Sequence, residues 1–446
     1  MPPDAPAPRP SLGLAACAAI VIGNMVGSGF YLSPAAVGRY GLLGIVFWAV
    51  MGAGAMCLGL TFARLARRMP ATGGPYAYTR AAYGDFAGFI VAWGYWISIW
   101  ASMPLIAAAF TGSVMDLVPA LRGNRSVAVA ITIGAMWLVT LTNLRGVKEA
   151  GRFAQITTYA KLVPFAAIAL LGLPFVRFST FSVFNPSGES LLAASAALAP
   201  LTMFAYLGLE SATVPAGDVR DPERTIPLAT ILGVSVAALL YVLGTTVVLG
   251  VVPRAQLVGS VAPFADAARA MWGNWAAHVV SIAVMISSLG ALNGWTLLMG
   301  QVPMAAAKDK LFPDVFARLS SHHVPAIGII LSSALATGLV LVQMSGGPGF
   351  AAVYTMLVSL ATMTAVIPYV FCSLADGLIS TRAGTAALPR IGAVEVVAFA
   401  FSIFTVYGCG PAPVLWGLLL LLFGIPVYVW QRQERARATV AARRVG

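Results

Sequence analysis

Long apolar runs that recur from one end of the chain to the other limit its possible folds more than any other feature. Most runs reach the ~18 residues that a transmembrane helix needs, and charges are rare within them. Only 9% of the 446 residues are charged and 59% are hydrophobic, whereas soluble domains carry about 25% charged residues and disordered chains are poor in apolar ones. The sequence therefore predicts an all-α membrane protein with many transmembrane helices.

The apolar runs predict twelve transmembrane helices when they are compared with the length of about 20 residues that spans a bilayer. The predicted helices lie at residues 12–38, 41–66, 83–113, 126–143, 153–176, 192–216, 226–251, 276–306, 325–344, 351–376, 391–410 and 412–431. The connections between them are short, so we expect no inserted soluble domain. We expect residues 1–11 to form a flexible cytoplasmic tail and residues 432–446 to form a basic cytoplasmic tail.

The positions of the lysines and arginines predict how these helices are oriented. With the N-terminus placed in the cytoplasm, 21 of the 27 Lys and Arg residues fall in inner segments, as the positive-inside rule requires. Both termini are then cytoplasmic. The net charge of +12 follows from this orientation and from contact with anionic membrane lipid, so we expect no nucleic-acid partner.

Metal, enzyme and channel functions find no support in the sequence. The four cysteines lie in apolar runs and the three histidines lie at helix ends or in loops, and none has the spacing of metal ligands. We expect no metal and no other cofactor. An intramembrane enzyme would need paired catalytic groups such as HExxH or Ser–His, and a channel would need a filter-like repeat; the sequence contains neither pattern.

Two of the predicted helices contain segments that weaken a helix in the middle of the bilayer. The first helix carries GNMVGSG (23–29), in which each of three glycines costs a helix about 1 kcal/mol relative to alanine. The sixth carries FAYLGLES (204–211), where the carboxylate of Glu210 lies close to Gly208. Freed backbone groups are tolerated at this depth only where they line a cavity or bind something. We therefore expect a broken helix at both places.

The spacing of these two segments predicts an internal repeat. They lie five helices apart, which is the inverted-repeat pattern of secondary transporters. A ten-helix transport core would occupy 12–376, with repeats at about 12–176 and 192–376, and helices 11 and 12 would occupy 391–431. Free N–H groups at the breaks suit a carboxylate and free carbonyls suit an ammonium, so the pair would receive the head group of an α-amino acid. The alternative is that the glycines only allow close helix packing.

Five longer motifs connect the chain to a known family. They are GNMVGSGFYLSP (23–34), PATGGPYAYTRAAYGDFAGF (70–89), LGLESATVPAGDVRDPERTIPLAT (207–230), LGALNGWTLLMGQVPMAAAKDKLFPDVFARL (289–319) and IPYVF (367–371). With them the chain resembles the amino acid–polyamine–organocation superfamily, and within it the arginine/agmatine antiporters and their putrescine and cadaverine relatives. The resemblance covers nearly all twelve predicted helices. It implies a LeuT-type 5+5 inverted repeat with helices 1 and 6 broken, a bacterial inner membrane and a homodimer.

The resemblance also implies which residues hold the head group of the substrate. Ser28 and Gly29 match the positions that hold the substrate carboxylate. The backbone carbonyls of Met25, Phe204 and Leu207 match those that accept hydrogen bonds from its amino group. We expect these five residues to meet at the two breaks.

Other matching positions imply a substrate chamber and its gates. Tyr95, Trp295 and Ser359 match residues that line or close the chamber. Glu210 matches the family's gate carboxylate, and we expect it to accept a proton or the substrate cation. The alternative for Glu210 is a structural carboxylate that caps the half-helix after the break. Tyr76 matches a cytoplasmic-side tyrosine linked to pH sensing in the arginine exchangers.

Some positions depart from the pattern of the arginine exchangers. Phe204 and Met103 replace a tryptophan and an asparagine that contact the guanidinium group, and Ser98 is only a modest polar replacement, so the pocket for the substrate's side chain is more apolar. Lys161 stands where those exchangers have a small apolar residue. Proton-coupled and sodium-independent relatives carry a lysine there, and a lysine within the membrane is usually functional. The alternative is that Lys161 snorkels to the cytoplasmic surface.

The sequence thus favours a transporter that is not an enzyme. We expect a secondary active exchanger of a cationic amino acid for a related amino acid or for its decarboxylated amine, with protons as a further partner. The alternative is a proton-coupled uptake carrier for neutral amino acids, which Met103, Phe204 and Lys161 favour.

Overall fold

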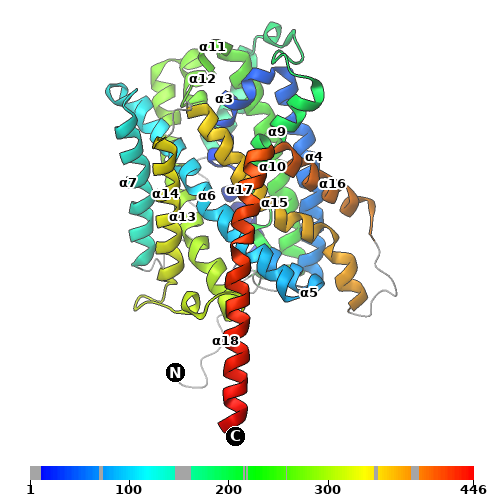
Figure 1. Cartoon of the computed structure of the whole chain (residues 1–446). Helices are drawn as coiled ribbons and strands as arrows, with labels where there is room; N and C mark the ends of the chain where they lie inside the picture. The colour runs from blue at the N-terminus through cyan, green and yellow to red at the C-terminus, as the bar shows by residue number, and fades with distance from the viewer. Residues whose placement is uncertain are drawn as a thin grey trace.

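The protein is a bundle of helices arranged roughly along one long direction (Figure 1). The computed structural model describes residues 12–69, 74–145, 162–213, 216, 219–257, 259–345, 350–382 and 391–445. Over these ranges the chain forms helices and turns but no β-strand, apart from a single bridge between Leu12 and Val219. The prediction of an all-α protein is confirmed.

The helices follow one another with few long connections. In chain order they are α1 (Leu14–Met25), α2 (Ser28–Tyr31), α3 (Ser33–Val37), α4 (Leu42–Arg68), α5 (Pro75–Tyr83), α6 (Asp85–Leu117), α7 (Arg125–Leu144), an unlabelled helix at Leu162–Leu171, α9 (Leu191–Tyr206), the 3-10 turn η5 (Ser211–Thr213), α10 (Pro222–Val251), α11 (Arg254–Leu257), α12 (Pro263–Trp272), α13 (Asn274–Lys308), α14 (Ala326–Ser345), α15 (Phe350–Arg382), α16 (Ala393–Gly408), α17 (Pro411–Leu422) and α18 (Gly424–Val445).

Several of these helices are long and apolar enough to cross a membrane. Eight stretches in the described residues meet both criteria, and four shorter apolar helices accompany them. The eight stretches are Leu42–Arg68, Asp85–Leu117, Arg125–Leu144, Leu191–Thr213, Pro222–Val251, Asn274–Lys308, Tyr354–Arg382 and Pro411–Arg435. The chain is therefore a multi-pass membrane protein, and the count of twelve spans stays a prediction.

Two short helices lie where the sequence predicted only connections. Helix α5 lies at one end of the bundle and α12 at the other (Figure 1). Both begin with a proline at their first turn, and both end at a glycine with positive φ, Gly84 at 92° and Gly273 at 90°. They were missed because each is much shorter than the span length that the apolar runs were compared with.

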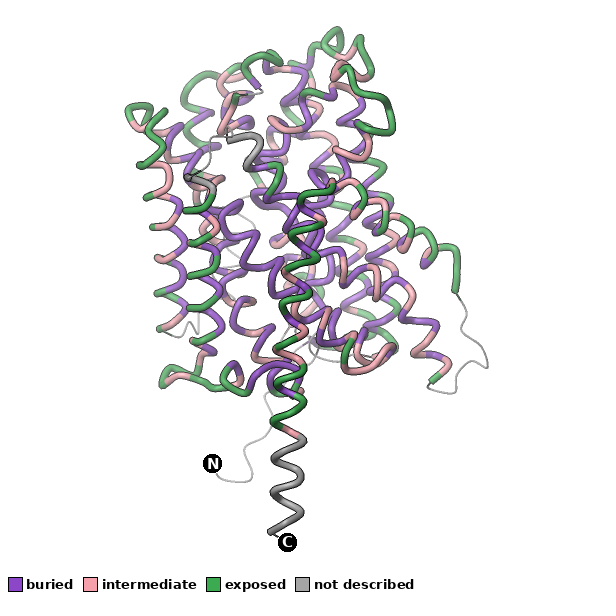
Figure 2. Tube along the Cα trace, viewed as in Figure 1, coloured by how far each residue is buried: buried purple, intermediate pink, exposed green. Residues whose placement is uncertain are grey.

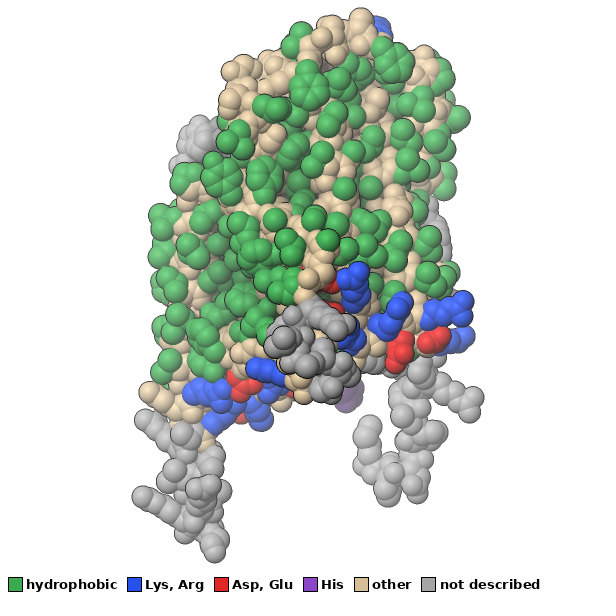
Figure 3. Space-filling model, turned by 90° about the vertical axis from the view of Figure 1, so that its right-hand side faces the viewer, with side chains coloured by type: hydrophobic (Ala, Val, Ile, Leu, Met, Phe, Trp, Pro, Cys, Tyr) green, Lys and Arg blue, Asp and Glu red, His purple; other side chains and the backbone are tan. Residues whose placement is uncertain are grey.

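The distribution of side chains is that of a protein embedded in lipid. Buried residues concentrate in the central helices, whereas outer helices alternate between buried and exposed positions (Figure 2). The exposed positions are often large and apolar, as at Phe423, Leu415 and Tyr407, which fits contact with lipid and not with water. Figure 3 shows apolar side chains along the flank and Lys and Arg gathered at the end from which α18 projects. We refer to this as the basic end.

Candidate functional site

Both predicted helix breaks are present. Helix α1 ends at Met25, and Gly27 has an extended backbone (φ −148°, ψ −151°) before α2 begins at Ser28. Helix α9 ends at Tyr206, and the chain then turns at Gly208, whose φ of +97° is a conformation that side chains other than that of glycine rarely allow. Of the glycines in the two segments, Gly27 and Gly208 therefore lie in the breaks themselves, whereas Gly23 lies in α1 and Gly29 in α2.

The two breaks lie against each other. A Cβ atom built on Gly29 would lie 2.9 Å from the Cα of Ala205, so the start of α2 touches the end of α9. A Cβ atom on Gly208 would lie 2.9 Å from the Cβ of Asn24, so the second turn touches the end of α1. Only glycine lets the backbones approach this closely. Segments about 180 residues apart in the sequence thus form one site.

Backbone groups at the breaks remain available for a ligand. The N–H groups of Gly27, Ser28 and Gly29 have no backbone acceptor within the described residues. The same ranges contain no backbone donor to the carbonyls of Met25 and Leu207. Free N–H groups at a helix start bind a carboxylate, and free carbonyls bind an ammonium. The arrangement can therefore receive a zwitterion.

The carbonyls at the end of α9 differ in how far they are already occupied. That of Phe204 accepts the N–H of Leu207 at a long 3.4 Å, which leaves it largely available. That of Ala205 accepts the Tyr241 hydroxyl at 2.8 Å, and this bond anchors the end of α9 to α10. The Phe204 carbonyl can therefore still accept a hydrogen bond from a substrate's amino group, although it is not wholly free.

Glu210 lies directly after the second break and binds two tyrosines. The residue is only 1% exposed. Its Oε1 atom accepts a hydrogen bond from the Tyr95 hydroxyl at 2.8 Å, and its Oε2 atom accepts one from the Tyr369 hydroxyl at 2.5 Å. The three residues, which we call the inner layer, connect the turn after α9 with α6 and α15. Glu210 and Tyr95 were predicted as site residues, whereas Tyr369 was not, since the sequence marks it only by its place in the IPYVF motif.

Aromatic side chains cover the opposite side of the first break. The Tyr31 hydroxyl lies 2.5 Å from the Ser287 hydroxyl, and the Tyr31 ring stacks on Phe165 at 4.6 Å between ring centroids. Phe30 packs on Phe264 of α12 at 4.7 Å. We call these five residues the outer layer. This layer was not predicted, because its members come from segments far apart in the chain.

The remaining predicted lining residues are buried on neighbouring helices. Ser98 and Met103 lie on α6, Trp295 lies on α13 and Ser359 lies on α15, each 8% exposed or less. The Ser98 hydroxyl donates to the carbonyl of Tyr95 at 2.7 Å, which leaves its lone pairs for a ligand. Their role in a chamber stays a prediction. Lys161 lies outside the described residues.

Tyr76 belongs to a separate polar cluster at the basic end. Its hydroxyl donates to Asp309 at 2.9 Å, and Arg80 pairs with Asp309 at 3.2 Å and with Asp85 at 2.8 Å. Burial and the neighbouring Asp309 carboxylate raise the pKa of Tyr76, because both disfavour a phenolate. The cluster fastens α5 to α13 and α6. Tyr76 therefore lies in the polar cluster at the basic end and not at the breaks.

Comparison with known proteins agrees with this geometry. The amino acid permease family matches residues 12–429. The putrescine transporter PotE of Haemophilus influenzae is 29% identical over 421 residues, which cover 94% of this chain and 96% of the relative. The cadaverine/lysine antiporter of Escherichia coli is 31% identical over 402 residues, which cover 89% of this chain and 87% of the relative. With its two broken helices side by side, this chain belongs to the amino acid permease family of the amino acid–polyamine–organocation superfamily.

Proposed function

We propose that the protein is a secondary active transporter that exchanges a cationic amino acid for a related amino acid or for its decarboxylated amine. The relatives named for putrescine and for cadaverine and lysine favour this cargo over a neutral one. The observation that carries the proposal is the contact between the two breaks, because it brings free N–H and C=O groups to one place in the membrane.

The head group of the substrate would bind to backbone atoms. Its carboxylate would accept hydrogen bonds from the N–H groups of Ser28 and Gly29, and its ammonium would donate to the carbonyls of Met25, Phe204 and Leu207. These groups recognise any α-amino acid. The side chains that set specificity would be Ser98, Met103, Phe204, Trp295 and Ser359.

Two closed layers would give alternating access. The inner layer of Glu210, Tyr95 and Tyr369 lies on the side of the breaks that faces the basic end, since Tyr95 is ten residues from the start of α6 at that end. The outer layer lies on the other side. If only one layer opens at a time, the site faces each side of the membrane in turn. Glu210 would take a proton or the substrate cation when its tyrosines move away, and Lys161 would couple protons to this movement.

The chain would cross the bacterial inner membrane twelve times with both termini in the cytoplasm. The basic end in Figure 3 supports this orientation, because Lys and Arg are retained on the cytoplasmic side and there meet anionic lipid. The five-plus-five repeat would occupy residues 12–376, and the pair of helices at 391–431 would follow it. With the basic end in the cytoplasm, the opposite end of the bundle would face outward. Two copies of the chain would form a homodimer.

Counterflow in proteoliposomes tests the proposed exchange. Liposomes loaded with unlabelled lysine should take up labelled lysine, cadaverine or putrescine from outside, and empty liposomes should not. Uptake of neutral amino acids into empty liposomes under a pH gradient alone would favour the alternative, a proton-coupled uptake carrier. Glu210→Gln should change the rate and its pH profile. Glu189→Gln is the matched control, because it removes an exposed carboxylate that pairs, among the described residues, with Arg39 alone.

A further inference from the structure

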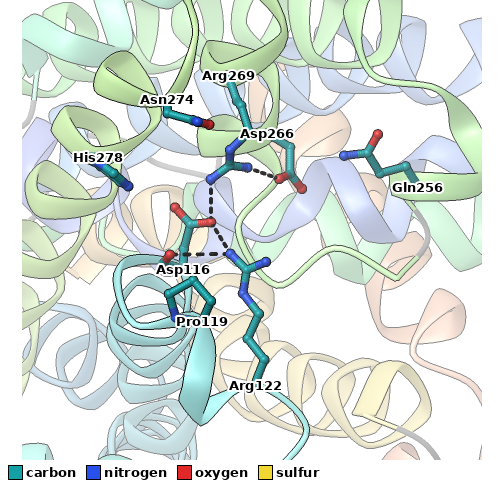
Figure 4. Close-up of a pocket in the computed structure, with 8 residues that line it drawn as sticks. All are labelled: Asp116, Pro119, Arg122, Gln256, Asp266, Arg269, Asn274 and His278. Carbon is teal, nitrogen blue, oxygen red and sulfur yellow. Dashed lines mark hydrogen bonds and ion pairs between the residues drawn. The ribbon is translucent and has the colours of Figure 1, made fainter.

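A polar cavity opens on the outer end of the bundle, away from the two breaks. Its volume is about 420 Å³. Asp116, at the end of α6, forms its floor and has a side chain only 2% exposed. Arg122, Asp266 and Arg269 surround this carboxylate, and Figure 4 shows the two guanidinium groups pointing at it from opposite sides. The cavity therefore has a charged floor that the exchange mechanism does not use.

The two carboxylates of the cavity are already occupied. Oδ1 of Asp116 accepts hydrogen bonds from Arg122 and Arg269, each at 2.7 Å, and its Oδ2 atom accepts one from Ser281 at 2.7 Å. Oδ1 of Asp266 accepts from Arg269 at 2.7 Å, and its Oδ2 atom accepts from a serine hydroxyl at 2.5 Å. Both lining carboxylates are therefore already paired with an arginine, and neither is left as an unpaired acidic group for a ligand's ammonium.

Hydrogen-bond donors on the wall of the cavity, in contrast, remain available to a ligand. Arg122 uses its Nε and Nη2 atoms, at the carbonyl of Met115 and at Asp116, and its Nη1 atom has no partner within the described ranges. The amide groups of Gln256 and Asn274 line the same cavity, and the described part of the chain offers them no side-chain partner. A guanidinium edge beside amide donors suits a carboxylate. The group that fits this cavity is therefore an anion.

The cavity also adjoins the outer layer. Ser281, which donates to Asp116, lines a second hollow of about 10 Å³ together with Tyr31 and Phe264. Tyr31 lies in α2, directly after the first break, and Phe264 lies in α12. Asp116 at the floor of the cavity is thus connected through Ser281 to the hollow that Tyr31 and Phe264 of the outer layer line.

We propose that this cavity is an outer docking site that holds the carboxylate of an incoming amino acid before the outer layer opens. This inference rests on the proposed exchange. It adds a reason why the amino acid, and not the amine, would be taken up from the outside. A decarboxylated amine lacks the group that the cavity binds. The site therefore raises the local concentration of the amino acid at the outer layer and not that of the amine.

Lysine and cadaverine are the probes that test the site, because they differ only in the carboxylate. In right-side-out membrane vesicles, Arg122→Gln should raise the KM for external lysine about tenfold and leave that for external cadaverine within about twofold. Arg254→Gln is the matched control: this exposed outer arginine donates to the backbone carbonyls of Arg39 and Pro186, outside the cavity. Equal changes for lysine and cadaverine would overturn the proposal.

A second experiment measures ligand binding in the cavity by thiol labelling and does not depend on transport. Gln256→Cys places a thiol on the cavity wall, where a membrane-impermeant maleimide can label it. The native cysteines are shielded, since three are buried and Cys57 is half-buried. External lysine should slow this labelling and cadaverine should not. Equal protection by both, or by neither, would contradict a carboxylate site. If the wild type shows no counterflow, the proposed exchange is refuted but the docking site is not, because the labelling experiment does not require transport.

Discussion

The inner layer permits a quantitative test of whether Glu210 and its tyrosines act as a unit. Tyr369→Phe removes the hydroxyl that lies 2.5 Å from Oε2 of Glu210, while the ring keeps its edge contact with Phe62 at 5.5 Å. A hydrogen bond to a charged group contributes about 1.5–3 kcal/mol. Because little packing is lost, we expect the substitution to lower the free energy of unfolding by about 2 kcal/mol.

A double-mutant cycle with Glu210→Gln separates the hydrogen bond from other effects. In the Glu210→Gln background the acceptor has no charge, so Tyr369→Phe should cost only about 0.5 kcal/mol, which leaves a coupling energy near 1.5 kcal/mol. The free energy of unfolding can be measured by titrating detergent-solubilised protein with sodium dodecyl sulfate. An identical cost in both backgrounds would show that the short contact contributes nothing specific.

The same substitution should also loosen the inner side of the site. A loss of about 2 kcal/mol in the closed state corresponds to a shift of roughly 30-fold toward the open state. Cys372 reports this opening, because its buried thiol donates to the carbonyl of Pro75 in α5 at 3.4 Å. Labelling of Cys372 by a membrane-permeant thiol reagent should accelerate by about 10- to 30-fold. An unchanged labelling rate would mean that the inner layer does not close this side.

Three further substitutions, the first with a control substitution beside it, test the geometry. Gly208→Ala should lower stability by about 2–3 kcal/mol and abolish counterflow, because φ is +97°, whereas Gly134→Ala, where a Cβ meets nothing within 4 Å, should be neutral or stabilising in the same unfolding assay. Tyr76→Phe should reduce the loss of stability at high pH. The raised pKa of Tyr76 gives stability that is complete below the ordinary tyrosine pKa and is lost as pH rises toward the folded-state value, so above about pH 10 the wild type should lose more stability than the variant. Arg432→Ala should cost at most about 1 kcal/mol, since its ion pair is largely exposed, and a larger loss of stability would contradict that reasoning.

The membrane character and the two breaks could be predicted from the sequence because both have local causes. Apolar runs become helices wherever lipid removes every other way to pair the backbone. Glycines at positions 23, 27 and 29 and at Gly208 weaken those helices regardless of what surrounds them. Glu210 was also predicted, because it follows the second break directly. In each case the deciding residues are neighbours in the chain.

Only the tertiary structure decided which residues complete each layer. Glu210 meets Tyr95 and Tyr369 across 115 and 159 residues of sequence, and Asp116 meets Arg269 across 153. No local pattern records which face of one long apolar helix lies against another, since their faces are almost equally apolar. The helix packing chooses these partners, and it therefore determines where the site closes and where an outer ligand can bind.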